Sequence, residues 1–327
     1  MKLYFTCITV FFHLTFTYCN QSNEFGVVHH FGSPFVTKDM TKVKKDVERI
    51  QSLGFQFVRE GIYWDNIGSK AYVDRLKSIV DLYKAHNIRL LGLLAYSNSK
   101  IARDKFSFIE LSENYSQVPI EDVSFYIAFQ FSKYFEKIIK EFPYIRYFEV
   151  LNEMNLTKYF TGGVDPIVTY ISILKFCYPI AQKYNVKLLT GGLLLEGDYL
   201  RWLDQLIEQN QYYDGLSLHP YCYPKMLSQA TFGGYSLQQI VQKIQKKSDI
   251  DVWITEVGWL HSPSKSINEK QDVLNEMVFE AVLSDTLKLT KNLGVEKTFI
   301  YAFEDDSYIT DLGYKPFGLQ LKTGKLK

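Results

Sequence analysis

The sequence RYFEVLNEMN, residues 146–155, joins an apolar run to a polar end. Its aromatic and aliphatic residues predict a buried strand. The run ends in an amide, a carboxylate and a second amide, which are Asn152, Glu153 and Asn155. Because an unpaired buried carboxylate is costly, such a cluster fits the end of a strand that faces a cleft, where a carboxyl group can handle protons. Alone, the stretch fits a strand followed by a polar turn equally well, so the other strands must decide.

Length and composition bound the possibilities. With 327 residues, the chain has room for two ordinary domains or for one large α/β barrel of about 250 residues. Its 37 basic and 36 acidic residues nearly cancel, so net charge predicts no nucleic-acid or other polyanionic partner. A hydrophobic content of 46% is sufficient for a sizeable core, and no Pro-, Gly- or Ser-rich linker divides the chain. We therefore expect one domain, at residues 20–327, in a monomer.

Residues 1–19 are typical of a signal peptide. Lys2 precedes an apolar stretch, and the small residues Thr17 and Cys19 suit cleavage before Asn20. The apolar run is shorter than the roughly 20 residues of a membrane-spanning helix. We expect a secreted or periplasmic protein with no stable membrane insertion after cleavage, and an uncleaved N-terminal anchor is the alternative.

Cysteine usage leaves two readings open. Removal of the signal peptide leaves Cys177 and Cys222, which suit either a disulfide or two free thiols. The sequence contains no CxxC pair and no HExxH motif, so we expect no metal site, and no organic cofactor is implied.

Eight segments with strand character alternate with seven segments of helical spacing. The expected strands cover residues 25–32, 55–67, 88–96, 146–155, 186–192, 214–221, 251–259 and 297–303. The expected helices cover residues 38–53, 72–86, 120–142, 164–184, 198–209, 236–247 and 268–293. Such alternation predicts an α/β fold with a parallel sheet, and eight units predict a single closed (β/α)8 TIM barrel. No pattern for an eighth helix follows the last strand, so we expect the barrel to lack it.

Polar residues mark the ends of several expected strands. Arg59 ends the second, Asn152 and Glu153 the fourth, His219 and Tyr221 the sixth, and Glu256 the seventh. In a barrel these ends share one face, where barrel enzymes keep their active sites. Glu153 and Glu256 then face each other, and two facing carboxyl groups are the minimum equipment for cleaving a glycosidic bond. Arg59 beside Glu256 would keep that carboxylate ionised.

Several motifs resemble those of the clan A retaining glycoside hydrolases. The fourth strand reads Leu151-Asn152-Glu153-Met154-Asn155 and the seventh reads Thr255-Glu256-Val257-Gly258-Trp259. Val58-Arg59 with Trp64, His219-Pro220-Tyr221, and the segment 301–306 extend the resemblance. Within that clan, the chain resembles members of family 39 or family 5.

The resemblance implies roles for individual residues. Glu153 would be the acid/base and Glu256 the nucleophile. Asn152 would bind the sugar hydroxyl beside the anomeric carbon, Arg59 would lie near the nucleophile, and His219 or Tyr221 would orient it. Aromatic residues and one further histidine are candidate substrate contacts: Tyr63, Trp64, Tyr96, Trp259, Phe303 and His30.

The sequence thus predicts a retaining O-glycoside hydrolase, endo-acting on a β-linked polysaccharide. One alternative is an exo-acting β-glycosidase of the β-xylosidase type. The other is a catalytically inactive barrel that binds glycans. Sugar identity and linkage depend on loop shapes that motifs do not specify.

Overall fold

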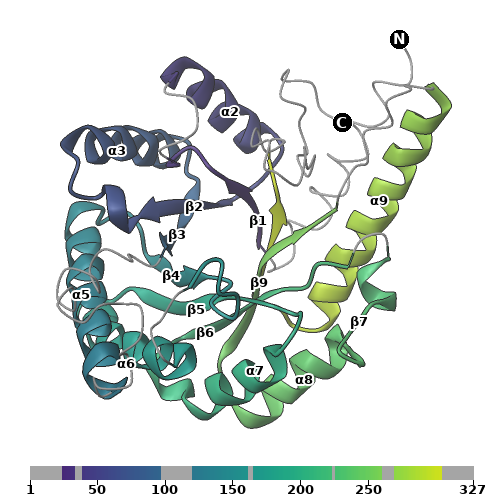
Figure 1. Cartoon of the computed structure of the whole chain (residues 1–327). Coiled ribbons are helices and arrows are strands. Elements are labelled where there is room, and N and C mark those ends of the chain that lie inside the picture. The colour runs from purple at the N-terminus through teal and green to yellow at the C-terminus, as the bar shows by residue number, and fades with distance from the viewer. Residues whose placement is uncertain are drawn as a thin grey trace.

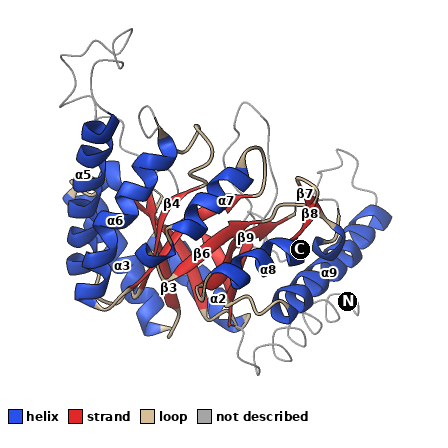
Figure 2. Ribbon diagram, turned by 90° about the horizontal axis from the view of Figure 1, so that it is seen from below, coloured by secondary structure: helices blue, strands red, loops and turns tan. Residues whose placement is uncertain are grey.

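The computed structural model describes residues 24–33, 39–96, 120–160, 165–222, 225–259 and 269–303. Eight parallel strands close into a barrel in the order β1-β10-β9-β6-β5-β4-β3-β2. Figure 1 looks into the ring of strands, and Figure 2 shows the same strands from below, enclosed by helices. The predicted TIM barrel is therefore confirmed.

The barrel strands and the helices alternate along the chain. The strands are β1 (Glu24–His29), β2 (Phe57–Tyr63), β3 (Arg89–Ala95), β4 (Tyr147–Asn152), β5 (Lys187–Leu194), β6 (Gly215–His219), β9 (Asp251–Gly258) and β10 (Lys297–Tyr301). The helices of the described residues are α2 (Met40–Ser52), α3 (Lys70–Ala85), α5 (Ile120–Glu141), α6 (Pro166–Tyr184), α7 (Tyr199–Glu208), α8 (Leu237–Lys247) and α9 (Glu269–Asn292). Each helix follows one strand. No helix follows β10 before residue 303, where the description ends.

One feature of the loop after β6 was not predicted. A short antiparallel pair, β7 (Thr231–Phe232) and β8 (Tyr235–Ser236), precedes α8. Ser236 then caps α8 in a capping box with Gln239. The two strands are two residues long, too short for an alternating pattern to reveal them.

Two apolar clusters separate the inside of the barrel from the outside. The larger one fills the space between the strands and the surrounding helices. The smaller one takes one residue from each of six strands and fills the barrel interior: Val28, Phe57, Leu91, Leu189, Trp253 and Phe299. Alternation along each strand assigns successive side chains to the two clusters. Arg89 and Lys297 lie over the Phe57 ring at the N-terminal ends of β3 and β10, and other polar side chains lie at the C-terminal ends of the strands.

Other expectations about the chain have mixed outcomes. Cys177 is buried and Cys222 half-buried, and both are free thiols. The helices of the described residues include none that is long and apolar enough to cross a bilayer. The expected signal peptide lies outside the described residues.

A buried carboxylate ties the first loop to the barrel wall. Glu60 of β2 points away from the interior and accepts hydrogen bonds from the backbone N–H groups of Phe31, Gly32 and Gly61, at 3.1, 2.8 and 3.1 Å. The Tyr83 hydroxyl donates a further bond at 3.3 Å. Burial raises the pKa of Glu60 to about 8, although these donors act in the opposite direction.

This raised pKa predicts a pH-dependent stability. The unfolded carboxyl loses its proton near pH 4.5 and the folded one near pH 8, so the contribution of Glu60 to stability is complete below pH 4.5 and is lost as pH rises toward 8. The loss amounts to at most about 1.4 kcal/mol per pH unit in that window. Glu60→Gln, which resembles the protonated acid, should abolish this decline in urea-unfolding measurements. The exposed Glu48→Gln variant is the control and should keep it. An unchanged decline in Glu60→Gln would contradict the assignment.

Candidate active site

A layer of polar side chains lies above the apolar plug. Arg59 comes from β2, Glu149 and Asn152 from β4, His219 from β6 and Glu256 from β9. These residues are at most 6% exposed. Charged groups so deeply buried require partners, and each of them has one within the layer.

Arg59 connects three of these groups. Its Nε donates to the Glu149 carboxylate, its Nη1 to Glu256 Oε1, and its Nη2 to Asn152 Oδ1 at 2.8 Å. Burial lowers the pKa of Arg59, but the carboxylates of Glu149 and Glu256 outweigh burial and raise it overall. The guanidinium is therefore a permanent cation that orients two carboxylates and an amide at once.

Glu256 is held as an anion. One carboxylate oxygen accepts from Arg59 and the other from the Tyr221 hydroxyl at 2.6 Å. Burial raises the pKa of Glu256, but the charges of His219 and Arg59 and the bond from Tyr221 outweigh it, so the pKa is lowered overall. An ionised carboxylate with both oxygens oriented is the form that a nucleophile needs.

A β-bulge turns Glu256 toward the interior. While β10 advances from Thr298 to Ile300, β9 advances by one residue more, from Ile254 to Val257. Ile254 and Val257 both pack in the outer cluster, and Thr255 and Glu256 between them both bond to interior groups. Bulges of this kind commonly re-aim a side chain beside an active site.

The end of β4 uses an unusual backbone to present Glu153. Leu151 and Glu153 have φ values of 63° and 42°, in the left-handed region that side chains other than glycine rarely adopt. Val150 and Leu151 pack outside the barrel, whereas Asn152 faces Arg59 inside. Asn155 fastens the next turn to β5, because its amide bonds both the N–H and the C=O of Leu194, at 3.2 and 3.0 Å.

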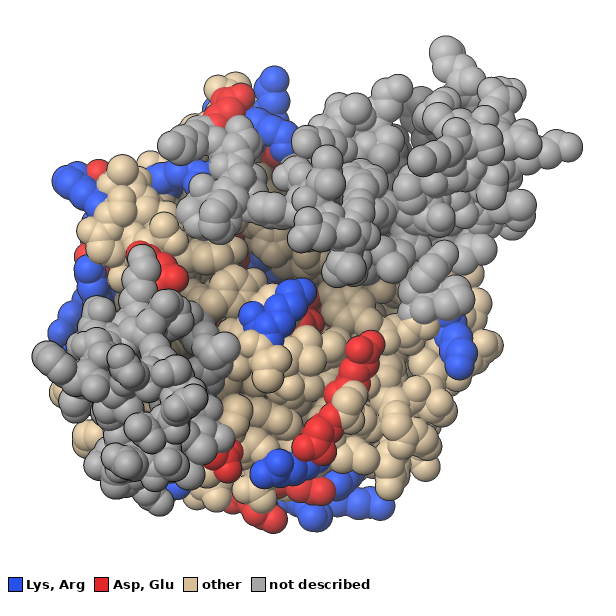
Figure 3. Space-filling view, in the orientation of Figure 1, with Lys and Arg blue, Asp and Glu red and all other residues tan. Residues whose placement is uncertain are grey.

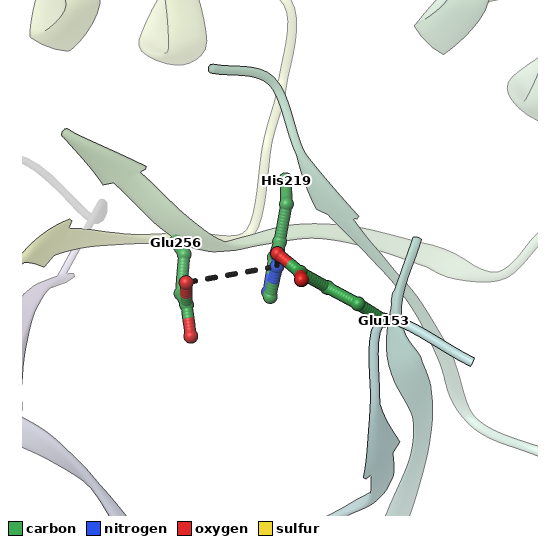
Figure 4. Close-up of side chains that lie close together, drawn as sticks. All are labelled: Glu153, His219 and Glu256. Atoms are coloured by element: carbon green, nitrogen blue, oxygen red, sulfur yellow. Dashed lines mark hydrogen bonds and ion pairs between the residues drawn. The ribbon is translucent and has the colours of Figure 1, made fainter. Parts of the chain in front are cut away.

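His219 lies between the two candidate catalytic carboxylates. Its Nδ1 is 3.1 Å from Glu153 Oε1 and 3.7 Å from Glu256 Oε2, so the nearer partner is Glu153 (Figure 4). Its Nε2 is 3.0 Å from Thr255 Oγ1, and that hydroxyl donates to Glu149 Oε1 at 2.8 Å. We expected His219 or Tyr221 to orient Glu256; Tyr221 bonds it directly, and His219 contacts mainly Glu153.

One oxygen of Glu153, one of Glu256 and one nitrogen of His219 all lie within 4.8 Å of one another. Within the described parts of the chain this is the only cluster with the donor set for a metal ion. Both oxygens of Glu256 already accept bonds from Arg59 and Tyr221. That arrangement suits a carboxylate that reacts or transfers protons better than a metal ligand.

Other candidate substrate contacts lie around the barrel mouth. Half-buried His30 has its ring 5.7 Å from that of Tyr301, and its charge is one of the smaller causes that lower the pKa of Glu256. Half-buried Tyr63 and Tyr96 have ring centroids 5.7 Å apart at the ends of β2 and β3. The geometry leaves these three near the mouth, and their contact with a sugar stays a prediction.

Three aromatic residues predicted as substrate contacts lie elsewhere. Trp64 packs between Phe131 and Tyr134 of α5, with ring centroids 5.2 and 5.4 Å away. Trp259 is 4% exposed and Phe303 fully buried, and both belong to the cluster outside the barrel. Their rings therefore lie in the core, and a contact with a sugar stays a prediction for these three. Large apolar rings gain more from packing against helices than from a rim exposed to water.

Sequence reasoning missed three residues of the site: Glu149, Thr255 and Tyr301. Tyr301 lies at the mouth, with its ring 6.2 Å from Tyr221. Glu149 had a signal, because a carboxylate inside an apolar strand requires a buried partner. Thr255 had none, since threonine is ordinary in strands and only the bulge of β9 turns it inward.

Comparison with known proteins agrees with this geometry. Residues 132–301 match the family model described as the glycosyl hydrolase catalytic core. The chain belongs to this family. It is a glycoside hydrolase. Comparison with curated proteins finds no significant match.

Solved structures with the same fold are distant in sequence. A beta-glucosidase from rice has a TM-score of 0.65 at 13% identity, with 94% of this chain and 95% of that chain covered. A beta-glucosidase from Thermotoga maritima has a TM-score of 0.57 at 14% identity, with 94% of each chain covered. The virulence factor SghA from Agrobacterium tumefaciens has a TM-score of 0.60 at 13% identity, with 92% of each chain covered. These similarities show the fold of the hydrolase.

Space for His219 depends on a glycine in β5. A Cβ atom at Gly192 would lie 1.9 Å from His219 Nε2. Gly192→Ala should therefore displace the imidazole and lower kcat/KM by about 10²-fold, the usual cost of misplacing a group of the active site. The measurement is hydrolysis of the aryl glycoside that the wild type cleaves fastest, with circular dichroism to confirm folding. Gly68→Ala is the matched control, because a Cβ there meets nothing within 4 Å, and it should leave kcat/KM unchanged.

Proposed function

We propose that this glycoside hydrolase is a retaining enzyme that cleaves internal bonds of a β-linked polysaccharide, with Glu153 as acid/base and Glu256 as nucleophile. The observation that carries the proposal is the asymmetry of the two carboxyl groups. Glu256 accepts from Arg59 and Tyr221, which favours the anion, while the nearest partner of Glu153 is an imidazole. Unequal environments of this kind divide the roles of acid and nucleophile.

The separation of the two groups supports retention. Retaining enzymes hold their carboxyl groups about 5 to 5.5 Å apart, and inverting enzymes about 6.5 to 9.5 Å apart, to leave room for a water molecule. An oxygen of Glu153 lies within 4.8 Å of one of Glu256. This distance suits direct attack by Glu256 on the sugar.

The reaction follows in two steps. Glu153 gives its proton to the glycosidic oxygen while Glu256 attacks the anomeric carbon, so that the bond to the leaving group breaks and a glycosyl-enzyme ester forms. The Glu153 carboxylate then takes a proton from water, whose oxygen attacks the same carbon and releases Glu256. The bonds from Arg59 and Tyr221 stabilise the departing Glu256 carboxylate. The amide nitrogen of Asn152 has no partner within the described residues, and it would donate to a sugar hydroxyl.

The mouth supports a substrate longer than one sugar. Tyr63, Tyr96 and Tyr159 are half-buried and contact one another in sequence, with ring centroids 5.7 and 5.5 Å apart. This row extends the rim beyond β4 with edges and hydroxyl groups that suit successive sugar units. On the face shown in Figure 3, the described residues carry charges of both signs between larger uncharged areas, which suits a neutral polymer. The two beta-glucosidases among the similar structures support the β configuration.

Two further parts of the proposal rest on the sequence. We propose that residues 1–19 direct secretion, with an uncleaved anchor as the alternative. We propose that the enzyme acts as a monomer. Amino-terminal sequencing of protein from the culture medium, together with light scattering, tests both.

Azide rescue distinguishes the roles of the two carboxylates. Glu153→Ala should hydrolyse substrates with poor leaving groups about 10²- to 10⁴-fold more slowly than the wild type. It should keep the rate of the first step on 2,4-dinitrophenyl glycosides, whose leaving group needs no proton. Added azide should then yield the β-glycosyl azide. The hydrolysis rate of Glu256→Ala should fall to background, and added azide should yield the α-glycosyl azide. Glu196→Gln, an exposed carboxylate just after β5, is the control and should keep wild-type activity. Swapped azide products would reverse the assignment, and an initial product of inverted configuration would refute retention.

Product analysis on reduced, end-labelled β-linked oligosaccharides tests internal cleavage. An endo-acting enzyme should release fragments of intermediate length before monosaccharide accumulates. The test begins with a panel of polysaccharides and aryl β-glycosides, including glucosides, xylosides and glucuronides. Monosaccharide released from one terminus from the earliest time point would replace the endo proposal with an exo-acting β-glycosidase.

A further inference from the structure

Three fully buried groups behind the catalytic pair form a chain of hydrogen bonds. His219, Thr255 and Glu149 each have 0% exposure. Thr255 Oγ1 lies 3.0 Å from His219 Nε2 and 2.8 Å from Glu149 Oε1. The proton positions within this chain of hydrogen bonds are therefore set by the groups themselves.

Counting protons along these hydrogen bonds identifies the tautomer of His219. The Glu149 carboxylate is ionised against Arg59 and can only accept, so the single hydroxyl proton of Thr255 points to Glu149. Thr255 Oγ1 can then only accept from His219. It follows that the proton of a neutral His219 is on Nε2.

The other nitrogen of His219 faces the acid/base. Nδ1 and Glu153 Oε1 are 3.1 Å apart, a hydrogen-bond distance that requires one proton between them. If His219 is neutral, the proton belongs to Glu153, which donates to the Nδ1 lone pair. If His219 is cationic, Nδ1 donates to the carboxylate. In both states the pair holds the one proton that a general acid must deliver.

Charged groups of the same layer surround Glu153 and His219. Within the layer, the guanidinium of Arg59 is opposed by two carboxylates, Glu149 and Glu256, which leaves an excess of negative charge beside the pair. The titratable and charged groups of this layer and its rim come from seven strands or the segments directly after them: His30, Arg59, Tyr96, Glu149, Tyr221, Glu256 and Tyr301.

We propose that Thr255 and Glu149 are positioning residues that hold the Nε2 proton of His219, so that Nδ1 of His219 and Oε1 of Glu153 share the one proton that the leaving oxygen takes. This inference rests on the proposed function, in which Glu153 is the acid/base. After the first step the lone pair faces a carboxylate, and their repulsion strengthens Glu153 as the base that takes a proton from water. The Nε2 proton stays in place throughout, so the cycle begins and ends with the same proton count.

Substitution of Thr255 tests the inference through the tautomer itself. In the ¹⁵N-histidine-labelled full chain, whose six histidines include His219, the wild type should show a protonated Nε2 and a bare Nδ1 for neutral His219. A His219→Gln variant assigns the signals. Thr255→Val keeps the shape of the side chain but removes the acceptor, and it should shift His219 toward the Nδ1–H tautomer. Thr255→Ser should restore the wild-type spectrum.

The pH profile of kcat/KM supplies the second measurement. In Thr255→Val, an Nδ1–H group would donate to the Glu153 carboxylate and favour its ionised form, so the basic limb should move to lower pH by about one unit. Thr255→Ser should restore the limb. Thr286→Val is the matched control, because the Thr286 hydroxyl is buried without a hydrogen-bond partner within the described residues, and its limb should not move.

The outcomes separate the inference from the function on which it rests. An Nδ1–H tautomer in the wild type, or a basic limb that is unmoved in Thr255→Val, would overturn the positioning roles and leave the carboxylate assignments intact. A basic limb that persists unchanged in Glu153→Gln would show that Glu153 is not the acid, which overturns the proposed function itself.

Discussion

The site depends on one buried cation. Arg59 is 1% exposed, and its guanidinium donates to two carboxylates and one amide from β4 and β9. A planar fork with fixed donor directions can satisfy several acceptors at once, which a flexible ammonium group does less well. Removal of this cation would leave two uncompensated carboxylates in an apolar barrel, which is far more costly than the loss of one surface ion pair. The layer therefore forms as a unit.

Regular strands alone would not assemble this unit. With strict alternation in β4, Leu151 would point inward and Asn152 outward. The left-handed backbone of Leu151 instead brings Asn152 to the interior, on the same side as Glu149. The bulge in β9 does the same for Glu256 after Thr255. In β5, Gly192 leaves the space that His219 occupies. Irregular backbone is concentrated where the chemistry lies, as expected when local strain is offset by a rigid surrounding barrel.

The network divides the two carboxyl groups by their partners. Glu256 is surrounded by donors, and Glu153 faces a histidine whose far nitrogen is committed to Thr255. The two residues are buried to the same extent, at 7% and 6% exposed, so the difference between their environments does not come from burial. Hydrogen bonding and charge, more than solvent access, distinguish the two carboxyl groups in this barrel.

The sequence by itself determined the barrel and the two carboxyl groups at its mouth. Strand and helix periods are local properties, and an acid after an apolar strand is visible within a few residues. Only the tertiary structure decided the other partners, because Arg59 also meets Glu149 across 90 residues of chain and His219 contacts mainly Glu153. It also decided that Trp64, Trp259 and Phe303 pack in the core and that Glu149, Thr255 and Tyr301 belong to the site. A one-residue bulge or a positive φ reverses the direction of a side chain, and no local pattern in the sequence encodes that reversal.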